Sequence, residues 1–333
     1  MYKRFIRPSL FKKDPETIHK DLIKAVKNCG QFTLVRNIIK HLYYAENSVT
    51  YHWKGLKFKN KIGLSAGFDK DASAYNELAM FGFGFIEIGT VTPHRNQGNP
   101  LPRIFRMEKC NSLISRTGFN NPGAEVIEKR LQKNHHHCIV GININKDPDT
   151  PEEFAATDFL SVFKRLYTFG DYFTVNWGSI SSEAMQQVLE TLTFFRNKQD
   201  KYRPILIKLP ADITEEAMNF AIAMAQTYQT DGYVATGPTM DHSTLSCYTE
   251  KELNKIGIGG VSGKALTFKA LKIVCSLREK VGNNTLIIGS GGIMNADDAR
   301  RMKEAGANLI QIYSAFIYEG PGVIRKMAHT IGK

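Results

Sequence analysis

Short apolar runs recur along the chain from residue 62 onward, with helical stretches between them. The runs lack alternating polar positions, so each predicts a strand that is buried on both faces. Eight runs have this pattern: residues 62–66, 85–89, 139–145, 172–177, 204–209, 231–236, 285–289 and 309–313. Eight such strands alternating with helices predict an α/β fold, a closed (β/α)8 TIM barrel.

The spacing of the runs is uneven. The second and third runs begin more than 50 residues apart, and so do the sixth and seventh. Long connections in compact domains are usually lids or binding loops. We therefore expect two functional loops at these places.

The first 60 residues are predicted to be helical. Asp14, Pro15 and Glu16 form a typical helix start, with an N-cap, a first-turn proline and an acid near the positive end of the helix dipole. Apolar residues then recur at helical spacing in two segments: Ile18, Leu22, Ile23 and Val26, followed by Leu34, Val35, Ile38, Ile39, Leu42 and Tyr43. We divide the chain into a helical extension, residues 1–50, and a barrel, residues 51–333.

The positive charge of the chain is concentrated in this extension. The formal net charge is +12, and residues 1–45 hold ten Lys or Arg against three acids. Short basic amphipathic helices suit docking on a membrane surface, although the same apolar faces could instead pack on the barrel. No nucleic-acid partner is expected.

The sequence also indicates a cellular location. No apolar run approaches the roughly 18 residues of a membrane span, and no secretory signal is visible. The five cysteines are scattered without a C-x-x-C pair, which favours reduced thiols. We therefore expect a cytoplasmic protein that associates peripherally with the inner (cell) membrane.

The ends of the predicted strands carry the residues suited to chemistry, as in barrels of this type. Glycines follow the first and seventh strands, at Gly67 and within residues 289–292, where the backbone can approach a flat ligand or a phosphate. Lys208 ends the fifth strand, and a buried ammonium needs an anionic partner. A reduced flavin, negatively charged near N1, would supply that partner.

Seven segments carry more specific motifs: residues 62–70 (IGLSAGFDK), 83–93 (FGFIEIGTVTP), 98–106 (GNPLPRIFR), 118–120 (GFN), 259–264 (GGVSGK), 288–292 (IGSGG) and 309–314 (LIQIYS). In combination they strongly resemble the class 2 dihydroorotate dehydrogenases, which are membrane-associated and quinone-dependent. Residues 7–11 (RPSLF) and 14–19 (DPETIH) are similar to the N-terminal extension of that class. The resemblance covers nearly the whole chain.

This resemblance implies an FMN enzyme of pyrimidine biosynthesis that oxidises dihydroorotate to orotate with quinone as electron acceptor. It assigns FMN binding to Ala66, Gly67, Lys70, Thr90, Asn143, Lys208, Thr236, Ser262, Gly263, Gly291, Gly292, Tyr313 and Ser314. It assigns substrate contacts to Asn120 and Asn176, and the role of base to Ser179. The N-terminal helices would form the quinone entrance, with His19, Arg106 and Tyr313 near it.

The base assigned to Ser179 agrees with the chemistry. Oxidation of dihydroorotate removes a proton from C5 while a hydride leaves C6, so a base must face the substrate opposite the flavin. Serine is a weak base unless it passes its proton on, and Ser181 or Ser182 could begin that relay. The alternative is that Ser179 is a loop hydroxyl bonded to nearby backbone.

Two loops depart from the family pattern. Where the family has Asn-x-Ser-Ser-Pro-Asn-Thr, residues 176–182 read NWGSISS; where it has Asn-Thr after the sixth strand, this chain has Gly237-Pro238. Each missing amide leaves substrate atoms unpaired at about 1–3 kcal/mol, unless Ser181 or water compensates. The alternative function is therefore FMN-dependent redox chemistry on a different small pyrimidine-like or carbonyl compound.

Three further interpretations are weaker. The run from His135 to Cys138 does not predict a metal site, because adjacent residues entering a strand point to opposite faces. An RNA-modifying flavin barrel is a lower alternative, because that chemistry calls for a cysteine where Ser179 stands. The third interpretation is a non-catalytic protein that binds flavin.

Trp177 is predicted to pack in the core.

Overall fold

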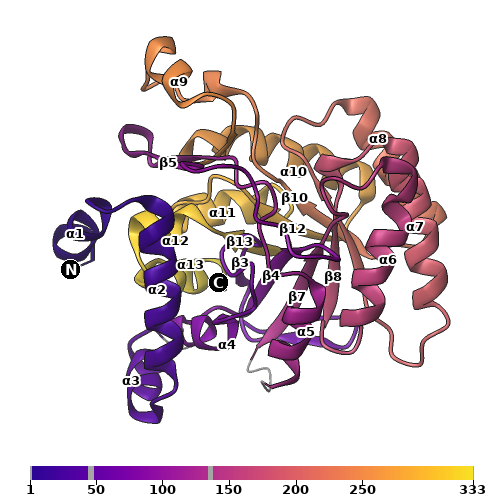
Figure 1. Cartoon of the computed structure of the whole chain (residues 1–333), viewed down its shortest axis with the longest axis horizontal. Coiled ribbons are helices and arrows are strands. Elements are labelled where there is room, and N and C mark those ends of the chain that lie inside the picture. The colour runs from indigo at the N-terminus through magenta and orange to yellow at the C-terminus, as the bar shows by residue number, and fades with distance from the viewer. Residues whose placement is uncertain (1, 44–48, 134–137, 333) are drawn as a thin grey trace.

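The eight predicted strands form a closed parallel barrel (Figure 1). The computed structural model describes residues 2–43, 49–133 and 138–332. The barrel strands are β3 (Ile62–Leu64), β4 (Phe85–Val91), β7 (Ile139–Ile144), β8 (Tyr172–Asn176), β9 (Ile205–Leu209), β10 (Gly232–Ala235), β12 (Leu286–Ser290) and β13 (Leu309–Ile312). They neighbour one another in chain order, and β13 closes the barrel against β3. The predicted TIM barrel is confirmed.

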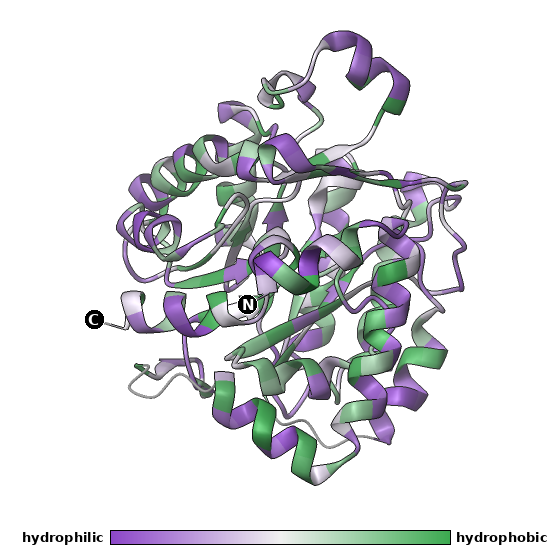
Figure 2. Cartoon of the chain, turned by 90° about the vertical axis from the view of Figure 1, so that its left-hand side faces the viewer, coloured by the Kyte–Doolittle hydropathy of each residue, from purple (hydrophilic) through white to green (hydrophobic). Residues whose placement is uncertain are grey.

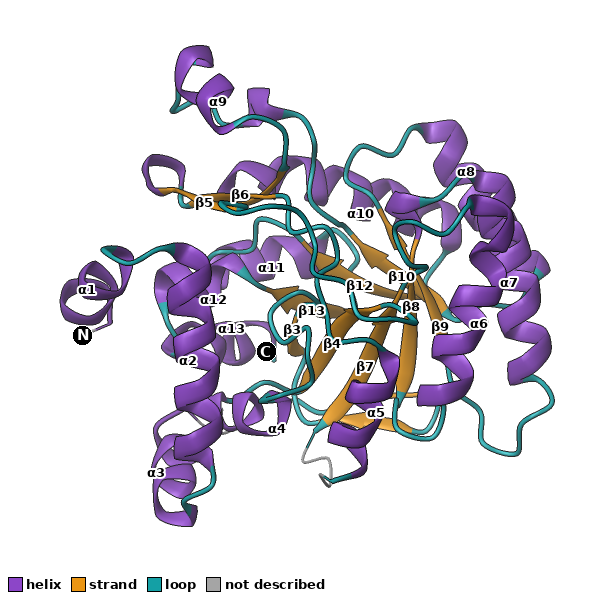
Figure 3. Ribbon diagram, in the orientation of Figure 1, coloured by secondary structure: helices purple, strands orange, loops and turns teal. Residues whose placement is uncertain are grey.

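Helices surround the barrel on the outside (Figure 3). They are α4 (Tyr75–Leu78), α5 (Ala124–Gln132), α6 (Ala155–Leu166), α7 (Ser182–Arg196), α8 (Glu215–Thr227), α10 (Thr267–Val281), α11 (Ala296–Glu304), α12 (Ser314–Glu319) and α13 (Gly322–Ile331). Short 3-10 turns are η2 (Ala79–Phe81), η3 (Glu108–Cys110), η4 (Glu152–Phe154), η5 (Trp177–Ser179), η6 (His242–Thr244) and η7 (Lys264–Leu266).

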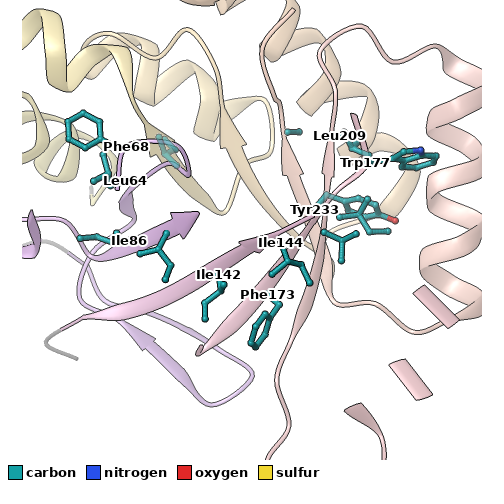
Figure 4. Packing of buried hydrophobic residues seen from close by; sticks show 14 of the residues in the cluster. Leu64, Phe68, Ile86, Ile142, Ile144, Phe173, Trp177, Leu209 and Tyr233 are labelled. Atoms are coloured by element: carbon teal, nitrogen blue, oxygen red, sulfur yellow. The ribbon is translucent and has the colours of Figure 1, made fainter. Parts of the chain in front are cut away.

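The main core lies between the strands and these helices (Figure 4). Phe163 of α6, for example, packs edge-on against Phe173 of β8, with ring centroids 4.6 Å apart. Trp177 is 6% exposed and its ring lies 6.0 Å from that of Phe220, which confirms its predicted packing role.

A hairpin at the amino-terminal end of the barrel corrects one prediction. Residues 51–58 are not helical: β1 (Tyr51–Trp53) and β2 (Leu56–Phe58) pair antiparallel. Lys54 and Gly55 form the two-residue turn, both at positive φ, the geometry that favours a tight hairpin. Phe58 packs on the barrel residue Phe85 with ring centroids 5.4 Å apart.

The N-terminal extension consists of η1 (Tyr2–Ile6), α1 (Arg7–Phe11), α2 (Pro15–Gly30) and α3 (Thr33–Tyr43), along one side of the barrel (Figure 1). Asp14 caps α2 as predicted, accepting from the Thr17 N–H at 2.8 Å. Part of the apolar face of α3 remains open, because Leu34 is 73% exposed and Ile38 and Leu42 are also exposed. Figure 2 shows the hydropathy of each helix along the chain. None of the helices in the described part of the chain is both long and apolar enough to span a bilayer.

The two long connections, one between β4 and β7 and one between β10 and β12, pair with each other outside the barrel. The first contributes β5 (Ile104–Met107) and β6 (Ser112–Ser115), and the second contributes α9 (Glu250–Ile256) and β11 (Gly260–Gly263). These strands form one sheet in the order β11-β6-β5, which the sequence did not predict.

Candidate active site

A cavity of about 370 Å³ lies at the carboxyl ends of the barrel strands. Its wall contains every residue predicted to bind FMN except Asn143, which lies directly behind it: Ala66, Gly67, Lys70, Thr90, Lys208, Thr236, Ser262, Gly263, Gly291, Gly292, Tyr313 and Ser314. The fold therefore gathers residues from six barrel strands and from β11 around one space.

Lys208 is the buried cation of this cavity. It ends β9 inside the barrel and is 9% exposed, and burial lowers the pKa of its ammonium. Among the described residues, none forms a hydrogen bond or a close ion pair with its ammonium. A buried ammonium without a protein partner favours an anionic or electron-rich ligand atom beside it.

A buried carboxylate, Glu87, interacts electrostatically with Lys208. Glu87 of β4 is fully buried and accepts hydrogen bonds from four side chains: Asn143 at 3.0 Å, Tyr172 at 3.1 Å, Thr174 at 3.1 Å and Gln311 at 2.8 Å. Its negative charge partly offsets the lowering of the Lys208 pKa. Sequence reasoning missed Glu87, although a lone acid within an apolar strand is a usable signal.

Asn143 connects this network to the cavity. Its side chain donates to Glu87 and accepts from the Thr90 hydroxyl at 2.7 Å. Asn143 thus fixes the orientation of Thr90, which lines the cavity. This buried network holds the cavity floor rigid.

Two glycines form the side of the cavity after β12. Gly291 and Gly292 both have positive φ. A Cβ on Gly292 would lie 2.3 Å from the backbone of Thr267, so only glycine allows this turn to pack on α10. Ser262 and Ser314 stand nearby, with hydroxyl oxygens 3.5 Å apart. Close backbone approach beside two hydroxyls suits a phosphate group.

Two predicted site residues from different loops, Lys70 and Asn120, are hydrogen-bonded to each other. The Lys70 ammonium donates to Asn120 Oδ1 at 2.8 Å. Burial lowers the pKa of Lys70 to about 8. Lys70 lines the cavity, whereas Asn120 is not among the lining residues and contacts the cavity only through the Lys70 ammonium. Asn176, at the end of β8, also lines the cavity.

The Ser179 hydroxyl is hydrogen-bonded to Asn145, a residue that the sequence analysis did not identify. The Asn145 amide reaches Ser179 Oγ with both its atoms, Nδ2 at 2.8 Å and Oδ1 at 3.0 Å. Asn145 is 1% exposed and follows β7 directly. It therefore fixes the Ser179 hydroxyl, and its position after a strand was the available signal.

Ser181 occupies a different place from the one expected. Its Oγ caps α7 by accepting from the Ala184 N–H at 3.3 Å, and its own N–H donates to the Glu152 carboxylate. Neither Ser181 nor Ser179 is among the residues that line the cavity, whereas Asn176 of the same loop is. The contact from Ser179 runs to Asn145 instead.

A second cavity, of about 590 Å³, lies between the extension and the barrel. Its wall is mostly apolar and includes all three residues predicted for the quinone side: His19, Arg106 and Tyr313. His19 Nε2 lies 2.8 Å from the Phe68 carbonyl, and burial lowers the pKa of His19 to about 4. Arg106 donates to the carbonyls of Phe11 and Lys13, and so holds the extension in place.

The two cavities share part of their walls. Ile104, Leu113 and Tyr313 line both of them. Burial raises the pKa of Tyr313 to about 12, so its phenol stays protonated. A ligand in the first cavity and an apolar ligand in the second would be separated by about one side chain.

Comparison with known proteins assigns the chain to a family. A family model described as dihydroorotate dehydrogenase matches residues 48–333. The chain is 39% identical over 341 residues to the dihydroorotate dehydrogenase (quinone) of Christiangramia forsetii, covering 99% of this chain and 98% of that protein. The chain belongs to the dihydroorotate dehydrogenase family. Members of this family are flavin-dependent oxidoreductases, and the resemblance to class 2 is confirmed.

Other relatives agree with this assignment. The dihydroorotate dehydrogenase (quinone) of Burkholderia thailandensis is 34% identical over 340 residues, covering 98% of this chain and 96% of that protein. The crystal structure of DHODH from Eimeria tenella in complex with ferulenol has a TM-score of 0.83 at 28% identity, covering 96% of this chain and 90% of that one. The ligand-free form has a TM-score of 0.84 at 29% identity, covering 96% and 94%.

The histidine run considered as a metal site lies mostly outside the described residues. His135, His136 and His137 lie outside the described residues, and Cys138 is partly buried with its pKa raised to about 12 by burial. Within the ranges that the structure describes, no group of three or more His, Cys, Asp or Glu side chains is placed to hold a metal ion.

Proposed function

We propose that this protein is a quinone-dependent dihydroorotate dehydrogenase that uses FMN and works at a membrane surface. The observation that supports this most is the shared wall between the two cavities, at Tyr313. One cavity has the polar groups that a flavin and a small carboxylate need, and the other is apolar and elongated along α2. Family membership supports the same reaction.

The residues of the first cavity fit FMN. Lys208 provides a cation with no protein partner for the N1 edge of the ring, and the glycine turn after β12 with Ser262 and Ser314 suits the phosphate. Bound there, FMN would supply the hydride acceptor of the reaction. Thr90, held by Asn143, would contact the ring from the strand ends.

The chain's own residues then hold the substrate and move its proton. Lys70 lines the first cavity and is a cationic donor suited to a carboxylate, and Asn120 holds its ammonium in place. Ser179 is the group proposed to take the C5 proton, and Asn145 orients its hydroxyl. Asn145 is a neutral amide that orients the hydroxyl but does not take up the proton, so the proton leaves Ser179 for solvent from the partly exposed loop.

The second cavity is proposed as the quinone site. His19 is neutral near pH 7 because its pKa is depressed to about 4, which suits an apolar head group better than a charged imidazolium would. The open apolar face of α3, with basic residues such as Arg36 and Lys40 beside it, supports shallow docking on an anionic membrane.

Steady-state turnover of dihydroorotate with a soluble quinone tests this proposal. We expect orotate formation only when both are present, and a fall in quinone affinity when Phe68→Ala removes a ring from the wall of the second cavity. Turnover that is independent of quinone, in FMN-loaded protein, would contradict it. Co-sedimentation with vesicles of anionic lipid, compared with neutral lipid, tests the membrane contact.

A further inference from the structure

Two cysteines lie side by side where the two long connections meet. Cys110 ends η3, between β5 and β6, and Cys247 lies just before α9 in the second connection. Their chain neighbours bind each other: the Lys109 N–H donates to the Tyr248 hydroxyl at 3.1 Å, and the Lys109 ammonium donates to Glu252 at 2.8 Å. Because Lys109 lies against Tyr248, the next residue along one segment, Cys110, is brought to the preceding residue of the other, Cys247.

The two cysteines are in direct contact. Cys247 is a hydrogen-bond partner of the Cys110 thiol through both its side chain and its backbone. Cys110 and Tyr248 also pack on one small apolar cluster, whose buried members come from both connections: Met107, Ile114, Leu245 and Val261. The contact between the two segments therefore has an apolar base as well as polar bonds.

The backbone around Cys110 is held in place. Ser112 Oγ donates to the Cys110 carbonyl at 3.0 Å and accepts from the Ala265 N–H at 3.0 Å. Ser112 also lies opposite Gly263 in the antiparallel pairing of β6 with β11. Linking two side chains across a contact that already exists costs little further conformational entropy.

The two thiols differ in their access to solvent and in their ionisation. Burial raises the pKa of the Cys110 thiol to about 11, and hydrogen bonding to the Cys247 side chain acts in the same direction. Cys110 therefore stays protonated at neutral pH, and a protonated thiol is a poor nucleophile. Cys247 is exposed, whereas Cys110 is partly buried, so a dissolved oxidant reaches Cys247 first.

We propose that Cys110 and Cys247 form a reversible disulfide when the protein meets hydrogen peroxide, and that this bond ties the two long connections together. The Cys247 sulfur attacks one peroxide oxygen, the O–O bond breaks, and a sulfenic acid and one water form. The Cys110 sulfur then displaces the hydroxyl group of the sulfenic acid, which leaves with the thiol proton as a second water. The two sulfurs together lose the two electrons that the peroxide gains, and a dithiol reductant reverses the bond.

The bond would restrain segments that build the first cavity. Both connections contribute to its wall: Ile104, Leu113, Ser115, Ser262 and Gly263. The second connection extends away from the barrel at α9 (Figure 1), and none of the residues of α9 is buried. A segment with so few packing contacts opens locally at low cost, and a covalent link at Cys247 opposes that opening.

The test follows the thiols of the full-length protein. The protein is reduced, freed of reductant, treated with hydrogen peroxide, unfolded and alkylated, and its mass is measured. We expect three of its five cysteines to be alkylated and a tryptic digest to contain the Cys110 and Cys247 peptides joined. Cys247→Ser should abolish the joined peptides, and so should Cys110→Ala. Cys275→Ser is the matched control, because Cys275 is also exposed but has Glu279 as its partner at 3.6 Å, and the yield should not change.

Two results would overturn the proposed bond. One is oxidation of Cys247 to a sulfinic acid without a link to Cys110, and the other is a link between two protein molecules in place of the internal one. Limited proteolysis tests the tie itself: trypsin should cleave after Lys251 of α9 about 10-fold more slowly in the oxidised protein, and dithiothreitol should restore the original rate. Equal cleavage rates in the oxidised and reduced protein would show that the bond does not hold the connections together.

Discussion

Arg103 holds the Glu16 carboxylate with two hydrogen bonds, from Nε to Oε2 at 2.8 Å and from Nη2 to Oε1 at 2.7 Å. Both side chains are buried, and the pair joins α2 of the extension to the segment that leads into β5. Hydrogen bonding to Arg103 lowers the pKa of Glu16 to about 2. The second cavity keeps its shape because this pair fixes α2 on the barrel.

Removing one partner of this pair should destabilise the protein strongly. Glu16→Ala leaves the Arg103 guanidinium buried without its counter-charge, which costs about 3–5 kcal/mol of unfolding free energy. Urea denaturation measures this. Glu304→Ala, which removes an exposed ion pair with Arg300, is the control and should change stability by under about 1 kcal/mol. If Glu16→Ala lowers the unfolding free energy no more than Glu304→Ala does, the pair of Glu16 and Arg103 does not anchor α2.

Acid should weaken the same contact over a defined range. The pKa of Glu16 is about 2 in the folded protein, against an ordinary 4.5, so its stabilising contribution is complete above pH 4.5 and is lost as the pH falls toward 2. Glu16→Gln should therefore show a smaller loss of unfolding free energy between pH 4.5 and 2 than the wild type. Parallel curves for the two proteins would refute the assignment.

His19 should make stability depend on pH in a higher range. Its pKa is lowered from 6.5 to about 4 by burial, so the unfolded chain binds a proton that the folded chain does not. Stability should consequently fall as the pH drops from 6.5 toward 4, and His19→Gln should flatten that part of the curve. The measurement is the melting temperature at half-unit pH intervals; an unchanged slope in the variant would count against a buried neutral His19.

Ser179→Ala should slow flavin reduction by dihydroorotate roughly 10²- to 10⁴-fold, the usual contribution of a positioned base. Reoxidation by quinone should be unchanged, because Ser179 does not line the second cavity. Asn145→Ala should give a smaller loss and shift the pH profile of flavin reduction, since the hydroxyl loses its fixed partner. Stopped-flow absorbance resolves the two half-reactions, and equal slowing of both would remove the role of Ser179.

Lys208→Met should weaken FMN binding by about 10- to 100-fold, the range expected for one charge-assisted hydrogen bond. Methionine keeps the apolar stem and fills the same space, so folding should be preserved. Flavin fluorescence during titration reports the affinity. An unchanged affinity would show that Lys208 does not contact the cofactor.

The barrel could be predicted from sequence because each buried parallel strand is an uninterrupted apolar run. The hairpin of residues 51–58 could not be separated from the preceding helices in the same way, since each strand has only three residues. Its Lys54-Gly55 turn was the missed signal. The sheet formed by β5, β6 and β11 depends on pairing between segments about 150 residues apart, which no local pattern contains.

The site was predictable to a similar extent. The strand ends and the family motifs gave the residues that line the first cavity, because parallel strands bring their carboxyl ends together. They did not give Asn145, whose role depends on the distance to Ser179, or Glu87, whose partners come from three other strands. Ser181 was expected at the substrate, but its hydroxyl caps α7.

The central claim is that the first cavity seats FMN, and the absorption spectrum of the purified protein tests it most directly. We predict a yellow protein with one FMN per chain, or one that takes up added FMN to that ratio with a change in flavin absorbance. A properly folded, colourless protein that binds no added FMN would contradict the account.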